Sequence, residues 1–379
     1  MKPIIAVPAI LALVHRAWSR KSLTPLGIIV AALTAIAHAV HPWSAPFLLL
    51  VVFYLGGTKV TKVKHNIKAH LTLSATGAEG GEGQRTHIQV LANSLVATVL
   101  ILAHARALVV SDPASTTTSE PCFSIPGRAA DVLVVGIVAN YAAVAADTFS
   151  SELGILSRSK PRLITSPTLR VVPPGTNGGV TAAGLAAGVL GAFTVAVASA
   201  LALPFCFSAA GGNAYALSVR AGWVLLVTVW GSLGSVLDSI LGGLLQASVV
   251  DKRTGKIVEG TGGKKVLVHP SATAPGGTAD VSGFAHRDAG SVHLRNTEEA
   301  ANAAALKGTR ATGTSGGASP GRTTEGHHES RRVESGWDIL DNNAVNLLMA
   351  ALMSVGGMGV ACWAWEVSAC EVGRLLWPF

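Results

Sequence analysis

Long apolar segments alternate with polar loops along most of the chain. Several of these segments approach the roughly 20 residues that an α-helix needs to cross the hydrocarbon core of a bilayer. Two shorter apolar runs flank His41-Pro42, and we expect them to form a tight helical hairpin instead of one long broken helix. The predicted spans are residues 26–40, 43–57, 88–110, 129–147, 180–207, 221–250 and 342–365.

One more apolar segment, from Pro3 to Val14, precedes these spans and is followed directly by Arg16, Arg20 and Lys21. It resembles the core of a signal peptide, but no cleavage spacing of the Ala-x-Ala type follows it. We interpret it as a retained anchor or a short first span.

The composition strengthens this pattern. Charged residues make up 13% of the chain, against roughly 25% in a soluble domain, and the mean hydropathy is +0.47. We predict an all-α polytopic transmembrane bundle of about seven to eight helices. Residues 1–250 hold most helices and the polar motifs, 251–341 form a hydrophilic loop, and 342–379 hold the last helix and a tail. Within the loop, residues 271–335 lack periodicity and are predicted to be a disordered insertion.

Basic residues are spread over the loops that flank the apolar segments. The net charge is +8, yet no single basic face of the kind that binds nucleic acid is indicated. The loops after Gly57, Asp147 and Val250 are basic at their membrane edges, whereas those at Ser111 and Ser208 are not. The positive-inside rule places the three basic loops in the cytosol or on an equivalent face. We expect a protein of an endomembrane, such as the endoplasmic reticulum, or of an organelle envelope; its oligomeric state is not defined by the sequence.

The cysteines have no metal-ligand spacing, which argues against a zinc site. They map to the face opposite the basic loops, where a disulfide and unpaired thiols both stay open. The four are Cys122, Cys206, Cys362 and Cys370.

Two carboxylates follow one apolar segment at the predicted membrane edge. Asp147 closes the run that begins near Ala129, and Glu152 lies five residues further on. Magnesium favours one or two carboxylates together with waters and substrate phosphates, so this edge is a candidate magnesium site. The simpler alternative is that both side chains are solvated or cap the helix end.

A glycine-rich run precedes the next apolar segment. Free backbone N–H groups at such a position can receive phosphate oxygens, although a plain turn is the commoner role. The residues concerned are Gly175, Thr176, Asn177, Gly178 and Gly179.

Further polar residues lie within or beside the later spans. Asp238 stands inside an apolar segment, where a carboxylate is costly unless it faces the bundle interior, pairs or binds a cation. Asp341 could be only the N-cap of the last helix, but three asparagines follow it: Asn342, Asn343 and Asn346.

Lys62 and Lys64 follow the hairpin and are either membrane anchors or phosphate contacts. The chain contains no Walker A sequence, so a nucleotide would have to bind the membrane domain itself.

Together these motifs resemble those of the transmembrane protein 19 family, integral membrane proteins that include the plant phytyl-phosphate kinases. The similarity runs from about residue 20 to residue 365 and leaves out only the 271–335 tract. Two motifs are the most specific, Asp147-x-x-x-Ser151-Glu152-x-Gly154 and Pro173-x-Gly175-Thr176-x-Gly178. The others lie in residues 57–64, 84–93, 237–242 and 340–346.

The resemblance implies a kinase that converts an isoprenoid (phytyl or prenyl) monophosphate to the diphosphate within a membrane. CTP as the nucleoside triphosphate follows from a looser similarity to CTP-consuming membrane enzymes such as dolichol kinase. In this hypothesis Asp147 and Glu152 hold Mg²⁺, and Asp238 is a second ligand or an orienting group. Gly175 to Gly179 cradle phosphates, Lys62 and Lys64 neutralise charge, and Asn342, Asn343 and Asn346 orient substrate or metal-bound waters.

Two other classes of protein stay open. A transporter could use the same Asp and Asn residues to bind an ion at the membrane midplane. The lack of clear inverted repeats and the clustering of polar residues at one face favour the enzyme. The third class is a membrane protein without catalytic activity.

Overall fold

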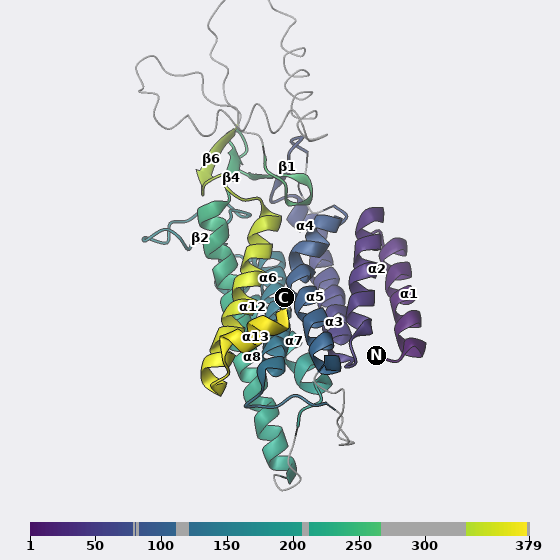
Figure 1. Ribbon diagram of the computed structural model, residues 1–379. Coiled ribbons are helices and arrows are strands. Elements are labelled where there is room, and N and C mark those ends of the chain that lie inside the picture. The colour runs from purple at the N-terminus through teal and green to yellow at the C-terminus, as the bar shows by residue number, and fades with distance from the viewer. Residues whose placement is uncertain (79, 81–82, 111–120, 207–211, 267–330, 377–379) are drawn as a thin grey trace, which may run out of the picture.

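The computed structural model describes residues 1–78, 80, 83–110, 121–206, 212–266 and 331–376. In these residues long helices form a bundle that carries a small sheet at one end (Figure 1). Six of the helices are long and apolar enough to cross a membrane, and α1 and α2 are shorter apolar helices. The predicted helical membrane bundle is therefore confirmed. Its helices are α1 (Pro3–Ser19), α2 (Pro25–Val40), α3 (Ala45–Lys62), α5 (His87–Val110), α6 (Ala129–Gly154), α7 (Ala182–Ala202), α8 (Gly212–Leu245) and α12 (Asn342–Trp365).

The predicted hairpin is present, because α2 and α3 are separate helices that pack on one another across a four-residue connection. Several helix bounds differ from the prediction, among them those of α3, α6, α7 and α8. Helix α6 continues past Asp147 to Gly154, so both predicted carboxylates lie on one helix. Helix α7 begins only after Thr181, whose hydroxyl accepts a hydrogen bond from the Gly184 N–H at 3.0 Å, and ends before Pro204.

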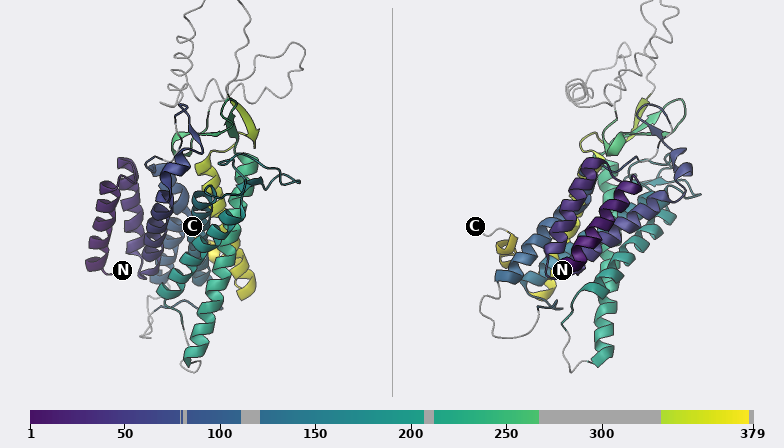
Figure 2. Two further views of the ribbon diagram at one scale, coloured as in Figure 1. Left: turned by 180° about the vertical axis from the view of Figure 1, so that it is seen from behind. Right: turned by 90° about the vertical axis from the view of Figure 1, so that its right-hand side faces the viewer.

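Helix α6 forms the centre of the bundle and packs against α3, α5, α7, α8 and α12 (Figure 2). Small residues on the neighbouring helices allow this close approach. A Cβ atom added to Gly191 of α7 would lie 2.5 Å from the backbone oxygen of Ala145, and one added to Gly234 of α8 would lie 2.5 Å from the Cβ of Ala143. These contacts fix which faces of α7 and α8 pack against α6.

The sheet end brings together segments that are far apart in the chain. Strands β1 (Leu73–Ser74), β5 (Ile257–Glu259), β4 (Ser248–Asp251) and β6 (Arg331–Ser335) form a sheet in the order β1-β5-β4-β6, with β1 and β5 parallel and the other pairs antiparallel. A separate pair joins β2 (Arg162–Leu163) to β3 (Gly179–Val180). The short helix α4 (His65–Ala69) and a 3₁₀ turn (Thr261–Gly263) lie at the same end.

This sheet corrects one end of the tract predicted to be disordered, residues 271–335 within the hydrophilic loop 251–341. Strand β6 falls inside the tract predicted to be disordered; the remainder of that tract, residues 271–330, lies outside the described residues. The physical reason is that Val249, Val250, Ile257 and Val258 bury their side chains in the sheet. A composition averaged over the whole loop hides such short β-branched segments.

The opposite end of the bundle is held by a disulfide. Cys122 and Cys206 are bonded, whereas Cys362 and Cys370 are free thiols. Next to the disulfide, Phe123 packs edge to face against Phe205 and Trp223. Both alternatives left open for the cysteines therefore occur, since one pair is a disulfide and two residues are thiols. Cys362 lies in α12 and Cys370 in α13 (Ala369–Leu376).

Candidate functional site

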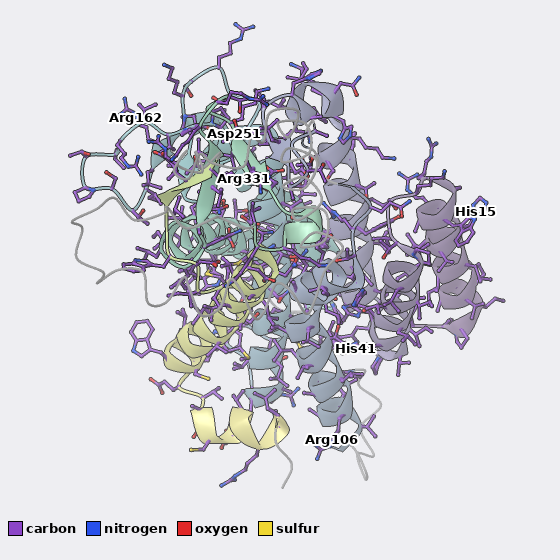
Figure 3. The ribbon with its side chains drawn as sticks, turned by 90° about the horizontal axis from the view of Figure 1, so that it is seen from above. His15, His41, Arg106, Arg162, Asp251 and Arg331 are labelled. Atoms are coloured by element: carbon purple, nitrogen blue, oxygen red, sulfur yellow. A yellow bond between two sulfur atoms is a disulfide. The ribbon has the colours of Figure 1, made fainter. Side chains whose placement is uncertain are left out.

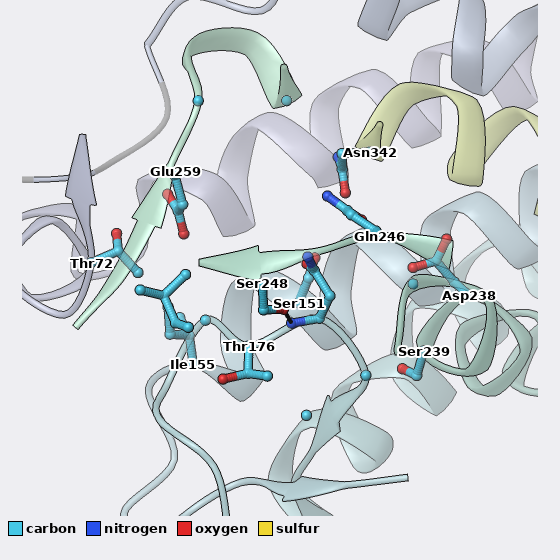
Figure 4. Close-up of a pocket in the computed structure, with 18 of the residues that line it drawn as sticks. Thr72, Ser151, Ile155, Thr176, Asp238, Ser239, Gln246, Ser248, Glu259 and Asn342 are labelled. Atoms are coloured by element: carbon cyan, nitrogen blue, oxygen red, sulfur yellow. Dashed lines mark hydrogen bonds between the residues drawn. The ribbon is translucent and has the colours of Figure 1, made fainter. Parts of the chain in front are cut away.

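A cavity of about 1600 Å³ lies where the helix ends meet the small sheet. Figure 4 shows Asp238, Gln246 and Asn342 on one side of it, and Thr72, Ile155 and Glu259 on the other. Most of the residues singled out in the sequence line this one space. They are Asp147, Glu152, Gly175, Thr176, Asn177, Gly178, Gly179, Asp238, Asn342 and Asn346.

Two carboxyl groups meet in the cavity wall. The side chains of Asp147 on α6 and Asp238 on α8 lie close enough to interact with each other. On α12, the Asn346 amide, turned so that its nitrogen faces acceptors, donates to Asp238 Oδ1 and to the Asn342 backbone oxygen, both at 3.2 Å. Two ionised carboxylates repel each other, so a shared proton or a cation between them would stabilise this arrangement.

The carboxyl pair fits a magnesium ion that arrives with phosphates. In the described part of the chain no group of three or more His, Cys, Asp or Glu side chains is arranged to hold a metal ion. Magnesium does not need such a cage, since one or two carboxylates suffice when waters and substrate phosphates complete its shell. Asp147 and Asp238 supply that minimum.

Glu152, predicted to share a magnesium ion with Asp147, is ion-paired with Lys68 of α4. The exposed fractions of the two side chains are 12% and 8%, so the pair is almost fully buried. Lys68 Nζ also donates to the backbone oxygens of Val60 at 3.3 Å and Thr61 at 2.6 Å, at the end of α3. This contact ties α4 to α3 and α6.

The basic side chains of the cavity wall differ from the two lysines predicted to neutralise charge. Lys62 and Lys64 are exposed and are absent from the described cavity lining. The loop lysines could not be ranked from the residue pattern, because all of them fit the positive-inside pattern equally well. The basic residues that do line the cavity are Lys68, Arg85, Lys264 and Lys265.

Asn343 supports the site from outside the cavity. Its amide nitrogen donates to the Gly262 backbone oxygen at 2.9 Å and so holds the 3₁₀ turn against the start of α12. Asp341 is the N-cap of that helix, as its Oδ1 accepts from the Ala344 N–H at 2.8 Å. Asn342 and Asn346 line the cavity, one turn apart.

The glycine-rich run is a fixed turn that packs on α8. Gly178 has φ of +77°, and a Cβ atom on it would lie 2.7 Å from Gly243 Cα, so only glycine fits there. The N–H of Asn177 donates to Ser248 Oγ at 2.9 Å, and that of Gly179 donates to the Thr176 oxygen at 2.9 Å. A phosphate cradle at this turn stays a prediction, and it depends on the N–H groups of Gly175 and Gly178.

Loss of the Lys68–Glu152 pair should destabilise the end of the bundle that carries the cavity. We expect Lys68→Gln to lower stability by about 3 kcal/mol, because it leaves a buried carboxylate without its partner. Thermal unfolding in detergent measures this effect. The matched control is Lys265→Gln, whose pair with Asp338 is partly exposed, with side-chain exposed fractions of 32% and 56%, and whose loss should cost below about 1 kcal/mol. Equal losses in both variants would contradict a structural role for the buried pair.

Comparison with known proteins places the chain in a family. Residues 8–354 match the family described as integral membrane protein DUF92. Protein PGR of Arabidopsis thaliana is 37% identical over 249 residues, which cover 64% of this chain and 79% of the relative. An uncharacterized membrane protein of Methanocaldococcus jannaschii is 42% identical over 113 residues, 30% of this chain and 40% of that protein. No solved structure matches significantly. Because the family match spans most of the chain, the protein belongs to the DUF92 family of integral membrane proteins.

Proposed function

We propose that this protein is a membrane-embedded kinase that transfers the terminal phosphoryl group of a nucleoside triphosphate, preferably CTP, to an isoprenoid monophosphate. One observation supports this most: a carboxyl pair, several basic side chains and a glycine-rich turn line the same cavity at one end of the helix bundle. The resemblance to the transmembrane protein 19 family and its phytyl-phosphate kinases points to the same reaction. The proposed partners are membrane lipids and these two substrates.

The reaction needs positioning and charge neutralisation more than covalent chemistry by the protein. An oxygen of the isoprenoid monophosphate attacks the terminal phosphorus, the bond from that phosphorus to the β-phosphate oxygen breaks, and the nucleoside diphosphate leaves. Asp147 and Asp238 would hold Mg²⁺, which when bound neutralises charge on the nucleotide phosphates. Asn346 keeps Asp238 oriented through its amide.

Cations and amides of the cavity wall would bind the phosphates of both substrates. Arg85 and Lys264 line the cavity, and Lys264 is exposed. Lys68 lies at the wall in its pair with Glu152, so it contributes positive charge only to the extent that a phosphate competes with that carboxylate. Asn342, at the first turn of α12, would donate or accept hydrogen bonds from its cavity-facing position.

The apolar tail of the acceptor needs a path from the cavity to lipid. Gly184 of α7 lines the cavity, and Leu185 and Val189 of the same helix are exposed, with fractions of 39% and 46%. A tail lying along this part of α7 would remain in hydrocarbon while its phosphate reaches the carboxyl pair. The proposed location is an endomembrane or organelle envelope, with the cavity facing the cytosol.

The proposal is tested with purified protein in detergent, magnesium, and terminally labelled CTP, ATP, UTP or GTP. Phytyl phosphate and farnesyl phosphate serve as acceptors, and the labelled diphosphate is separated by chromatography. Product is expected with at least one nucleotide, CTP above the others. If a folded preparation yields none with any combination, the kinase proposal fails, and ion transport or a non-catalytic role takes its place.

A further inference from the structure

A second concave surface lies on the other side of α3, at the same end of the molecule as the cavity. It is a groove of about 450 Å³ between the last turns of α1 and α3. Thr61 of α3 lines the large cavity, whereas Lys59 and Lys62 line the groove, so the last turns of α3 separate the two spaces. The groove is lined by Arg16, Arg20, Leu55, Thr58, Lys59 and Lys62.

The groove gathers positive charge. Among the described residues, its lining holds four basic side chains and no acidic one. Within the described residues none of these four takes part in an ion pair. Four like charges around one groove repel one another, and a bound anion would relieve that repulsion. The ligand chemistry indicated is therefore anionic, with more than one negatively charged oxygen or several hydrogen-bond acceptors.

The surface that continues from the groove along the helices is apolar. Leu55 and, two turns earlier, Leu48 are exposed on α3, with fractions of 37% and 38%. On α1 the positions one and two turns before Arg16 are Ala12 and Ala9, which carry small apolar side chains. This surface suits a hydrocarbon chain below an anionic headgroup.

The groove is also accessible from the surrounding lipid. Viewed from the sheet end, α1 lies at the rim of the bundle, with His15 at the outer edge, on the far side from Arg162 (Figure 3). Helix α1 packs on α2 and, through Val14 and Leu13, reaches the apolar side chains of α3. A lipid can therefore enter the groove sideways without crossing the bundle.

We propose that this groove is a binding site for one anionic glycerophospholipid. Its phosphate lies between Arg16 and Arg20 on one side and Lys59 and Lys62 on the other, and an acyl chain follows Leu55 and Leu48. Basic pockets between transmembrane helices at a membrane face bind acidic headgroups in this manner. The site goes beyond the proposed kinase activity, since none of its four basic residues lines the cavity.

The test titrates purified protein in detergent with phosphatidylglycerol or with phosphatidylcholine of the same acyl chains, and native mass spectrometry counts the bound lipids. Wild-type protein should retain one phosphatidylglycerol at least about tenfold more tightly than phosphatidylcholine. The variant Arg16→Gln/Arg20→Gln/Lys59→Gln/Lys62→Gln should lose this preference. A control with the same loss of charge, Lys64→Gln/Arg158→Gln/Lys160→Gln/Arg253→Gln, changes exposed residues outside the groove and should keep it.

Three results would overturn the site. They are equal binding of the two lipids to wild-type protein, an unchanged preference in the fourfold groove variant, and displacement of phosphatidylglycerol by inorganic phosphate alone. If the fourfold variant does not fold, the Arg16/Arg20 and Lys59/Lys62 pairs are changed separately, and each should weaken the preference. Asp147→Asn should bind phosphatidylglycerol as the wild type does, so failure of the groove and failure of the kinase proposal are distinguishable.

Discussion

Asp147→Asn and Asp238→Asn should each lower the rate of phosphoryl transfer by about a hundredfold or more, while the protein stays folded. Asparagine keeps the shape of the carboxyl group and its hydrogen bonding but carries no charge. Because the two carboxyl groups lie close together and would share one cation, removal of either charge should weaken magnesium binding. Initial rates measured across a range of magnesium concentrations show the effect.

The matched control is Asp251→Asn. Asp251 lies at the end of β4, outside the described cavity lining, where its Oδ1 accepts from the N–H groups of Arg253 and Thr254. Asparagine can accept the same bonds, so the rate should stay within about twofold of wild type. Equal and small effects in all three variants would remove the carboxyl pair from the proposed mechanism.

Gly191→Ala should lower stability clearly, unlike a methyl addition at an open position of the bundle. The new Cβ would lie 2.5 Å from the backbone oxygen and 2.9 Å from the carbonyl carbon of Ala145 on α6. Neither atom can move without shifting the central helix, so α7 must separate from α6. Overpacking of this kind costs about 1–3 kcal/mol, which thermal unfolding in detergent detects.

Gly359→Ala is the comparison for that prediction, because a Cβ atom at Gly359 of α12 meets no heavy atom within 4 Å. Alanine favours a helix over glycine by about 1 kcal/mol, so this variant should be neutral or slightly more stable. A Gly191→Ala protein that unfolds at the wild-type temperature would show that α6 and α7 are not packed as closely as described.

The parts of the fold that depend on local pattern could be predicted from the sequence. Apolar length predicted the spans and the hairpin around His41-Pro42, because a bilayer imposes a helix length on each crossing. The distribution of basic loops predicted that the acidic cluster and the start of the last helix lie on one face, and Asp147 and Asn346 do line the same cavity. Asp238, which was expected only inside a span, lines that cavity too. No residue pattern in the loops, however, distinguished Lys68 from its exposed neighbours.

The parts that depend on helix rotation could not be predicted. Asp147 meets Asp238 because of how α6 and α8 turn toward one another, and that rotation is fixed by contacts such as Gly234 against Ala143. The pairing of Glu152 with Lys68 likewise depends on where α4 docks. The pairing of β4 with β6 could not be predicted either, because these strands are separated by the long loop and no local residue pattern indicates which strands pair.

The central claim is that the terminal phosphoryl group of a nucleotide ends on an isoprenoid monophosphate at the cavity. The most direct measurement incubates purified wild-type protein with magnesium, phytyl phosphate and CTP whose terminal phosphate carries ¹⁸O, and analyses the lipid by mass spectrometry. The account predicts phytyl diphosphate with the heavy phosphoryl group from wild-type protein and almost none from folded Asp147→Asn. Absence of the heavy diphosphate from folded wild-type protein, also with ATP, UTP or GTP and with farnesyl phosphate, would contradict it.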